Sequence, residues 1–188
     1  FRLGFVGRLR AEKNGRMFVD LEEELIKKGK TNFKFLIVGE GNEREHLQRN
    51  LKNAEFTGFL SGEQLAEAYA NMDVFIFASE TDAFGNVAQE AAASGVVPIV
   101  TDKGGPKFLV THGETGYVAS SLEDFRDRVI ELMDDPQKLE AMRRQARISA
   151  ETKSWDAIFE SVYDAYNETI RLENEKKLKL ENNPAEAA

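Results

Sequence analysis

The sequence contains no cysteine among its 188 residues and only two histidines. A chain without cysteine cannot form disulfides, use a thiolate nucleophile or hold a cysteine-bound metal, which excludes disulfide scaffolds and zinc ribbons. His46 lies in a polar segment and His112 in a turn before Gly113, and neither has metal-ligand spacing around it. We therefore expect both histidines to be surface residues, and we predict no metal site.

An excess of positive charge is also missing. The chain has 33 acidic and 25 basic residues, a formal net charge of -8. Nucleic acids and anionic membrane surfaces bind basic faces, so neither is expected as a direct partner. No apolar run approaches the roughly 20 residues that span a bilayer. With 41% hydrophobic residues, the chain can nevertheless build an ordinary core.

Short apolar runs alternate with amphipathic stretches along most of the chain. Residues with helical apolar spacing separate most of the predicted strands, which are 3–6, 33–39, 54–59, 73–78, 96–101 and 116–119. This alternation predicts an α/β fold, a Rossmann-like doubly wound parallel sheet of about six strands with helices on both faces. Ligands of such sheets bind beyond the carboxyl ends of the strands, where the strand order reverses.

The chain shows no internal repeat and no internal boundary, so we expect one domain over residues 1–172. Its last helix is strongly amphipathic, and the apolar face either covers the core of this domain or awaits another domain. This face comprises Trp155, Ile158, Phe159, Val162, Tyr163, Tyr166 and Ile170. From Glu173 the pattern gives way to "ENEKKLKLENNPAEAA", and we predict a charged, disordered tail over residues 173–188.

Cations follow the first predicted strand, in the loop "GRLRAEK" that begins at Gly7. Arg8 can bind phosphate oxygens in bidentate fashion, and Lys13 can act beside it as a mobile point charge. Taken alone, these residues are better explained as two solvated surface cations.

Glycines follow the second and fifth predicted strands. Gly39 and Gly41 lie in "VGEGNE", which is too short for the dinucleotide-binding pattern, and a tight turn explains it equally well. The stretch "TDKGGPKFLV" has paired glycines before Pro106. These glycines permit close approach of the backbone to a ligand, but they are also common in turns.

The loop after the fourth predicted strand contains two spaced carboxylates. A helix should begin near Gly85 and Asn86, where unpaired N–H groups and the helix dipole favour an anion such as phosphate. Asp82 precedes this helix and Glu90 lies more than one turn inside it, so the two acids suit the hydroxyls of a sugar nucleotide. Alternatively, Asp82 caps the helix and Glu90 is a solvated helix charge.

Three stretches together resemble a known family: "GRLRAEK", "DAFGNVAQEAAASG" and "VPIVTDKGGPKFLVTHGETGYV". They are similar to the C-terminal, donor-binding domain of the retaining glycosyltransferases of family four (glycosyltransferases group 1), which have the GT-B fold. The family usually has Glu, seven residues and a second Glu in the middle stretch. Here Asp82 takes the first position, so its side chain is one methylene shorter.

The resemblance implies a role for each site residue. Arg8 and Lys13 would hold the donor diphosphate and stabilise charge on the leaving nucleotide, Glu90 would bind the ribose hydroxyls, and Asp82 would position the transferred sugar. The residues with implied catalytic roles are Arg8, Lys13, Asp82 and Glu90. The residues implied to bind the nucleotide-sugar are Gly7, Arg8, Lys13, Gly39, Gly41, Phe59, Asp82, Ala83, Phe84, Gly85, Asn86 and Glu90, with Gly39 and Phe59 near the base.

The resemblance also implies partners. The donor would be a UDP-sugar or a GDP-sugar, with no cofactor and no metal. The acceptor and a catalytic histidine would belong to an N-terminal domain that precedes this chain, which opens directly in a predicted strand. We expect a cytoplasmic protein whose N-terminal domain can reach the inner membrane, and we expect this domain alone to be inactive. The alternatives are a lobe of a nucleotide-sugar 2-epimerase and a non-catalytic nucleotide- or carbohydrate-binding module.

Overall fold

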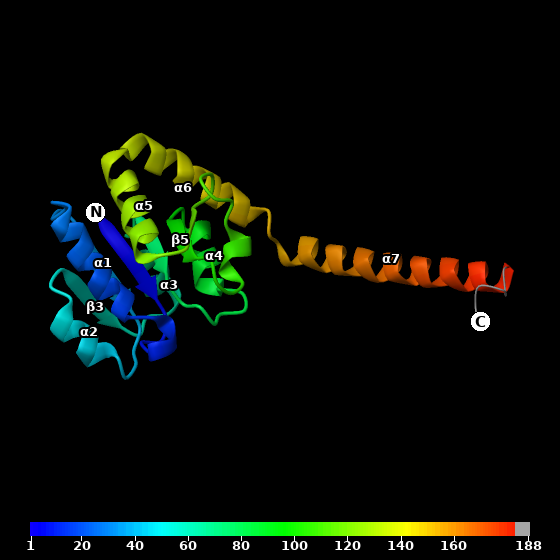
Figure 1. The fold of residues 1–188 in the computed structure, drawn as a ribbon, viewed down its shortest axis with the longest axis horizontal. Coiled ribbons are helices and arrows are strands. Elements are labelled where there is room, and N and C mark those ends of the chain that lie inside the picture. The colour runs from blue at the N-terminus through cyan, green and yellow to red at the C-terminus, as the bar shows by residue number, and fades with distance from the viewer. Residues whose placement is uncertain (183–188) are drawn as a thin grey trace. The chain divides into compact units, whose positions relative to one another are not determined.

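The computed structural model describes residues 1–182, which fall into two units, residues 1–150 and residues from 151 onward (Figure 1). The first unit contains a six-stranded parallel sheet in the order β3-β2-β1-β4-β5-β6. Its strands are β1 (Arg2–Val6), β2 (Lys34–Val38), β3 (Ala54–Gly58), β4 (Val74–Phe77), β5 (Val97–Thr101) and β6 (Tyr117–Ala119). The predicted fold class is confirmed, and the strand order reverses between β1 and β4.

Helices cover both faces of the sheet. One face packs against α1 (Arg16–Lys27), α2 (Arg44–Asn50), α5 (Leu122–Asp134) and α6 (Pro136–Glu151), and the other against α3 (Gly62–Ala70) and α4 (Asn86–Ala93). Alternate strand residues belong to different cores: Phe35 and Ile37 join the first cluster, and Leu36 and Val38 the second. A strand buried on both faces needs apolar residues at every position, which explains the continuous apolar runs of the sequence.

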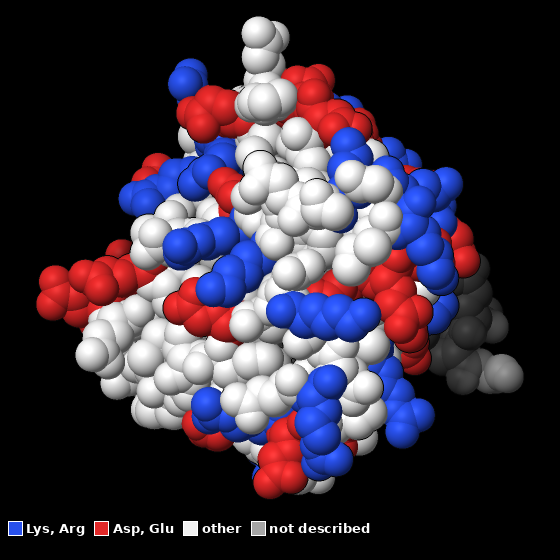
Figure 2. All heavy atoms as spheres, turned by 90° about the vertical axis from the view of Figure 1, so that its left-hand side faces the viewer, with Lys and Arg blue, Asp and Glu red and all other residues white. Residues whose placement is uncertain are grey.

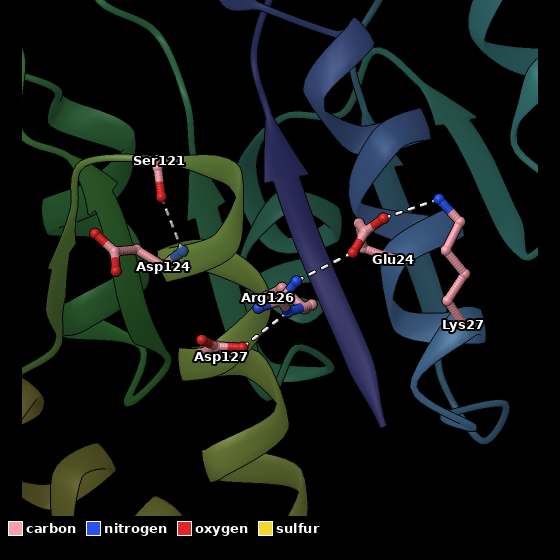
Figure 3. A network of polar contacts seen from close by, with 6 residues as sticks. All are labelled: Glu24, Lys27, Ser121, Asp124, Arg126 and Asp127. Atoms are coloured by element: carbon pink, nitrogen blue, oxygen red, sulfur yellow. Dashed lines mark hydrogen bonds and ion pairs between the residues drawn. The ribbon is translucent and has the colours of Figure 1, made fainter.

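Polar contacts join α1 to α5 on the first face (Figure 3). The Arg126 guanidinium donates to Glu24 at 3.1 Å and to Asp127 at 2.8 Å, and the Lys27 ammonium donates to Glu24 at 2.9 Å. At the start of α5, the hydroxyl of Ser121 accepts the backbone N–H of Asp124 at 3.2 Å. Only the Arg126–Glu24 ion pair joins the two helices, and the other contacts are local to α1 or to α5.

The second unit is a single helix, α7 (Trp155–Asn182). It includes the predicted amphipathic segment, and one helix cannot bury its own apolar face. The structure describes residues 173–182 as part of α7 and divides the two units after Ala150, whereas the sequence predicts a domain to residue 172 and a disordered tail from residue 173, a division that stays a prediction. Charged pairs one turn apart stabilise the polar half: Arg171 pairs with Glu168 and Glu175, and Lys176 with Glu173. Residues 183–188 of the predicted tail lie outside the described part.

Through residue 182, no helix combines the length and the apolar content that crossing a membrane requires.

Candidate functional site

A cavity of about 480 Å³ opens at the carboxyl ends of β1 and β4, where the strand order reverses. Its walls come from the loop after β1, which includes the 3-10 turn η1 (Ala11–Lys13), and from the loop that joins β4 to α4. The predicted site residues in its lining are Gly7, Arg8, Lys13, Asp82, Ala83, Phe84, Gly85 and Asn86. Residues far apart in the sequence thus meet where a doubly wound sheet binds its ligands.

An ion pair connects the two walls of the cavity. The Lys13 ammonium donates to both carboxylate oxygens of Asp82, at 2.8 and 2.6 Å, and the two side chains are 18% and 26% exposed. Burial raises the pKa of Asp82, but the hydrogen bonds from Lys13, the nearby Ser79 hydroxyl and the charges of Lys13 and Arg8 outweigh it, so the net pKa is lowered. Asp82 is therefore an ionised carboxylate at neutral pH.

Arg8 is the second cation of the cavity and differs from Lys13 in its contacts. Its side chain is exposed, and it has no hydrogen bond or ion pair with any residue of the described chain. A guanidinium without a protein partner can direct its donors at an anion in the cavity.

The amino end of α4 supplies further donors. Its N-cap, Gly85, has a left-handed φ of 87°, and no side chain caps the helix, which rules out the alternative in which Asp82 is the cap. The backbone N–H groups of Asn86 and Val87 have no acceptor in residues 1–182, and both residues line the cavity. Unpaired N–H groups at the positive end of a helix dipole favour a phosphate.

The paired glycines of the loop after β5 contact the loop between β4 and α4, called the acidic loop below, and do not line the cavity. An ideal Cβ at Gly105 would lie 1.7 Å from the carbonyl oxygen of Ala83, and one at Gly104 would lie 2.6 Å from that of Asp82. The Gly105 N–H also donates to the Asp82 carbonyl at 2.9 Å. These glycines let two loops approach closely, and this contact fixes the backbone of Asp82.

Gly39 and Gly41 serve a similar contact at the other side of the site. Their ideal Cβ atoms would lie 1.9 Å from the carbonyl oxygen of Gly7 and 2.1 Å from that of Leu9. Neither glycine lines the cavity, and neither does Phe59, which follows β3 with 77% of its surface exposed. Their assignment to the nucleotide therefore stays a prediction, and the loop contact alone accounts for the two glycines.

Glu90 is held in place by a residue that the sequence did not single out. The buried hydroxyl of Tyr69, on α3, donates to Glu90 at 2.8 Å. Burial and the Glu90 carboxylate together raise the pKa of Tyr69 well above its usual value, so the phenol stays protonated. Glu90 is exposed but does not line the cavity. The role of Glu90 in binding ribose remains a prediction. The Tyr69 hydroxyl orients the Glu90 carboxylate.

The histidines take part in local contacts away from this cavity. His112 Nδ1 accepts the backbone N–H of Val118 at 3.1 Å, and His46 Nδ1 lies 3.4 Å from the Asn50 amide. Among the described residues, no three His, Asp or Glu side chains form a group that could hold a metal. Figure 2 shows basic and acidic side chains interspersed over the face that it displays.

Comparisons with known proteins agree with one another. The family described as "Glycosyl transferases group 1" matches residues 1–149. A GDP-mannose-dependent alpha-mannosyltransferase of Corynebacterium glutamicum is 34% identical over 173 residues, covering 90% of this chain and 40% of that protein. Another protein of that name, from Mycobacterium tuberculosis, is 37% identical over 172 residues, covering 90% of this chain and 43% of the relative. The chain thus spans less than half the length of these relatives.

Solved structures share the fold at lower identity. Anabaena Alr3699/HepE, crystallised with UDP and glucose, superposes with a TM-score of 0.75 at 19% identity, covering 89% of this chain and 48% of that one. The C-terminal domain of a glycosyl transferase group 1 family protein (LpcC) from Francisella tularensis gives a TM-score of 0.69 at 23% identity, covering 81% of this chain and 85% of that one. The second structure is of an isolated domain of similar extent.

Proposed function

The chain belongs to the glycosyl transferases group 1 family, and we propose that it is the donor-binding half of a retaining glycosyltransferase. The complete protein would transfer a sugar from a nucleotide-diphospho-sugar to an acceptor that another domain holds. The observation that carries this proposal is the cavity at the strand reversal, which combines cations, unpaired N–H groups and one carboxylate.

Each group of the cavity suits one part of such a donor. Arg8, Lys13 and the N–H groups of α4 would surround the diphosphate and stabilise the charge that develops on it as the sugar leaves. Asp82 would accept a hydrogen bond from a sugar hydroxyl, and Glu90 from the ribose. These donors supply the positive charge that a divalent cation provides at other diphosphate sites, so the proposal includes no metal and no cofactor.

The donor to test first is GDP-mannose. The relatives from Corynebacterium glutamicum and Mycobacterium tuberculosis carry GDP-mannose-dependent names, at 34% and 37% identity. A UDP-sugar is the alternative, because the HepE structure of similar fold was determined with UDP and glucose.

Transfer itself would require the rest of the protein. The acceptor site and the closure that excludes water belong to a two-domain enzyme, so residues 1–188 alone should bind the donor and transfer nothing. Assays with GDP-mannose and UDP-glucose and a panel of sugar and lipid acceptors would check this. Robust transfer by the isolated chain would contradict it.

Calorimetry on residues 1–188 tests the binding role directly, with GDP, UDP, GDP-mannose and UDP-glucose as ligands. We expect one nucleotide series to bind, and Lys13→Met to weaken that binding by about tenfold or more, because it removes a charge-assisted contact to phosphate. Lys34→Met is the matched control, since Lys34 also pairs with a carboxylate, Glu55, but at the amino end of the strands. Failure of all four ligands to bind, or equal losses in both variants, would defeat the proposal.

A further inference from the structure

The Lys13–Asp82 pair has a consequence for the order of events in the site. A lysine ammonium has three protons to donate, and both oxygens of Asp82 accept from it. The cation proposed to bind the diphosphate is thus neutralised by a carboxylate of the protein itself. A diphosphate and Asp82 compete for the same ammonium.

The pair can open without moving the loops that carry it. The Asp82 backbone is held by the Gly105 N–H, which donates to its carbonyl at 2.9 Å. The hydroxyl of Ser79 donates to the Glu12 carbonyl at 3.2 Å and ties the acidic loop to the turn that carries Lys13. Only the two side chains therefore need to change partner.

Arg8 provides the contrast that makes such an exchange useful. It lines the same cavity and has no partner in the described chain, so it can contact an incoming phosphate at once. Lys13 can contribute its full charge only after it leaves Asp82. A carboxylate left unpaired in a partly buried site is costly, so the exchange is favourable only when Asp82 gains a new hydrogen-bond donor.

We propose that Asp82 exchanges partners, holding Lys13 until a complete donor binds and then accepting a hydrogen bond from a hydroxyl of the sugar. This inference rests on the proposed function. A nucleoside diphosphate satisfies Lys13 but leaves Asp82 without a partner, whereas a nucleotide-sugar satisfies both. The exchange thus makes the site favour the donor over the nucleotide product, and the return of Asp82 to Lys13 promotes product release.

A double-mutant cycle in calorimetry tests the exchange, with GDP and UDP as probes. Asp82→Ala and the isosteric Asp82→Asn should bind the diphosphate about five- to tenfold more tightly than the wild type, because the competitor for Lys13 is gone. In a Lys13→Met background, the same changes at Asp82 should leave the affinity within about twofold. GDP-mannose and UDP-glucose should lose their advantage over the matching diphosphate in both Asp82 variants.

Glu55→Gln is the control, since it removes the same charge from a Lys–Glu pair at the other end of the strands. Tighter diphosphate binding in the Asp82 variants, abolished by Lys13→Met, supports the exchange. Unchanged or weaker binding overturns it, and so does equal tightening in the Lys13→Met background, which would indicate direct repulsion by Asp82. If neither diphosphate binds the wild type or the variants, the proposed function itself fails.

Discussion

Polar groups at the amino ends of the parallel strands differ from those at the carboxyl ends in their protein partners. At the amino ends, Asp73 accepts the backbone N–H of Arg2 at 2.8 Å and pairs with Arg143 at 3.3 Å, and Lys34 pairs with Glu55 at 3.1 Å. These polar groups at the amino ends are satisfied by the protein and contribute to its stability.

At the carboxyl ends, Lys13 and Asp82 pair with each other, but other polar groups have no partner within the described residues. The Arg8 guanidinium and the N–H groups of Asn86 and Val87 face the cavity unpaired within residues 1–182. Donors left without a protein partner at this edge are available to an anionic ligand. Changes at the carboxyl ends should therefore alter binding, and changes near the amino ends should alter stability alone.

The largest effect is expected from Gly105→Val, which disrupts the close contact between the loops after β4 and β5. Its Cβ would meet the Ala83 carbonyl oxygen at 1.7 Å, so the acidic loop must shift. We expect a loss of about 3 kcal/mol in the free energy of unfolding. A shift of this loop by about 1 Å can weaken diphosphate binding up to roughly 100-fold. Urea unfolding and calorimetry would measure the two effects.

Gly95→Ala is the control for this variant. Gly95 has a φ of 70° and no atom within 4 Å of an added Cβ, so it should incur backbone strain of about 1 kcal/mol without any change in binding. Wild-type diphosphate affinity in Gly105→Val would show that the loop contact does not position the site.

The next effect concerns stability alone. Glu22 on α1 is buried, and its carboxylate accepts the backbone N–H groups of Lys52 and Asn53 at 2.8 and 2.7 Å, just before β3. Glu22→Gln should lower the free energy of unfolding by about 2 kcal/mol, because the new amide NH₂ at this buried position would face a backbone N–H donor that it cannot accept. Urea unfolding would measure this loss, with diphosphate affinity unchanged. Glu45→Gln, at an exposed ion pair, should cost under about 0.5 kcal/mol.

If Glu22→Gln changed the diphosphate affinity by more than about twofold, a change near the amino ends of the strands would alter binding as well as stability. That result would contradict the contrast between the two ends.

The smallest effect is expected from Tyr69→Phe, which removes the hydroxyl that orients Glu90. If Glu90 binds the ribose, GDP or UDP affinity should fall by about two- to threefold and pyrophosphate affinity should not change, because pyrophosphate has no ribose. Tyr117→Phe is the matched control, since its buried hydroxyl has no hydrogen-bond partner among residues 1–182. A loss of pyrophosphate binding in Tyr69→Phe would instead place the effect at the phosphate site.

The fold was predictable because its signals are local. Runs such as "FKFLIV" and "DVFIFA" need burial on both faces, and the parallel order follows from the helices between them. The cavity was predictable for the same reason, since the loops after β1 and β4 must meet where the order reverses. The end of α7 could not be predicted in this way. Ion pairs one turn apart support a helix in a charged segment that has no apolar face.

The contacts within the site were less accessible to sequence reasoning. The Lys13–Asp82 pair joins residues 69 positions apart, and the Tyr69–Glu90 bond joins residues 21 apart. No spacing rule connects such positions. For the glycines at positions 39, 41, 104 and 105, the sequence allows either a ligand contact or a turn, and it does not reveal that carbonyl groups of other loops are their neighbours. Only the assembled loops show which backbone each glycine must accommodate.

The most direct test of the account is a crystal structure of residues 1–188 with bound GDP-mannose or UDP-glucose, whichever calorimetry selects. The account predicts that the diphosphate contacts Arg8, the Lys13 ammonium and the N–H groups of Asn86 and Val87, with Lys13 released from Asp82. A diphosphate bound elsewhere, with the Lys13–Asp82 pair intact, would contradict it.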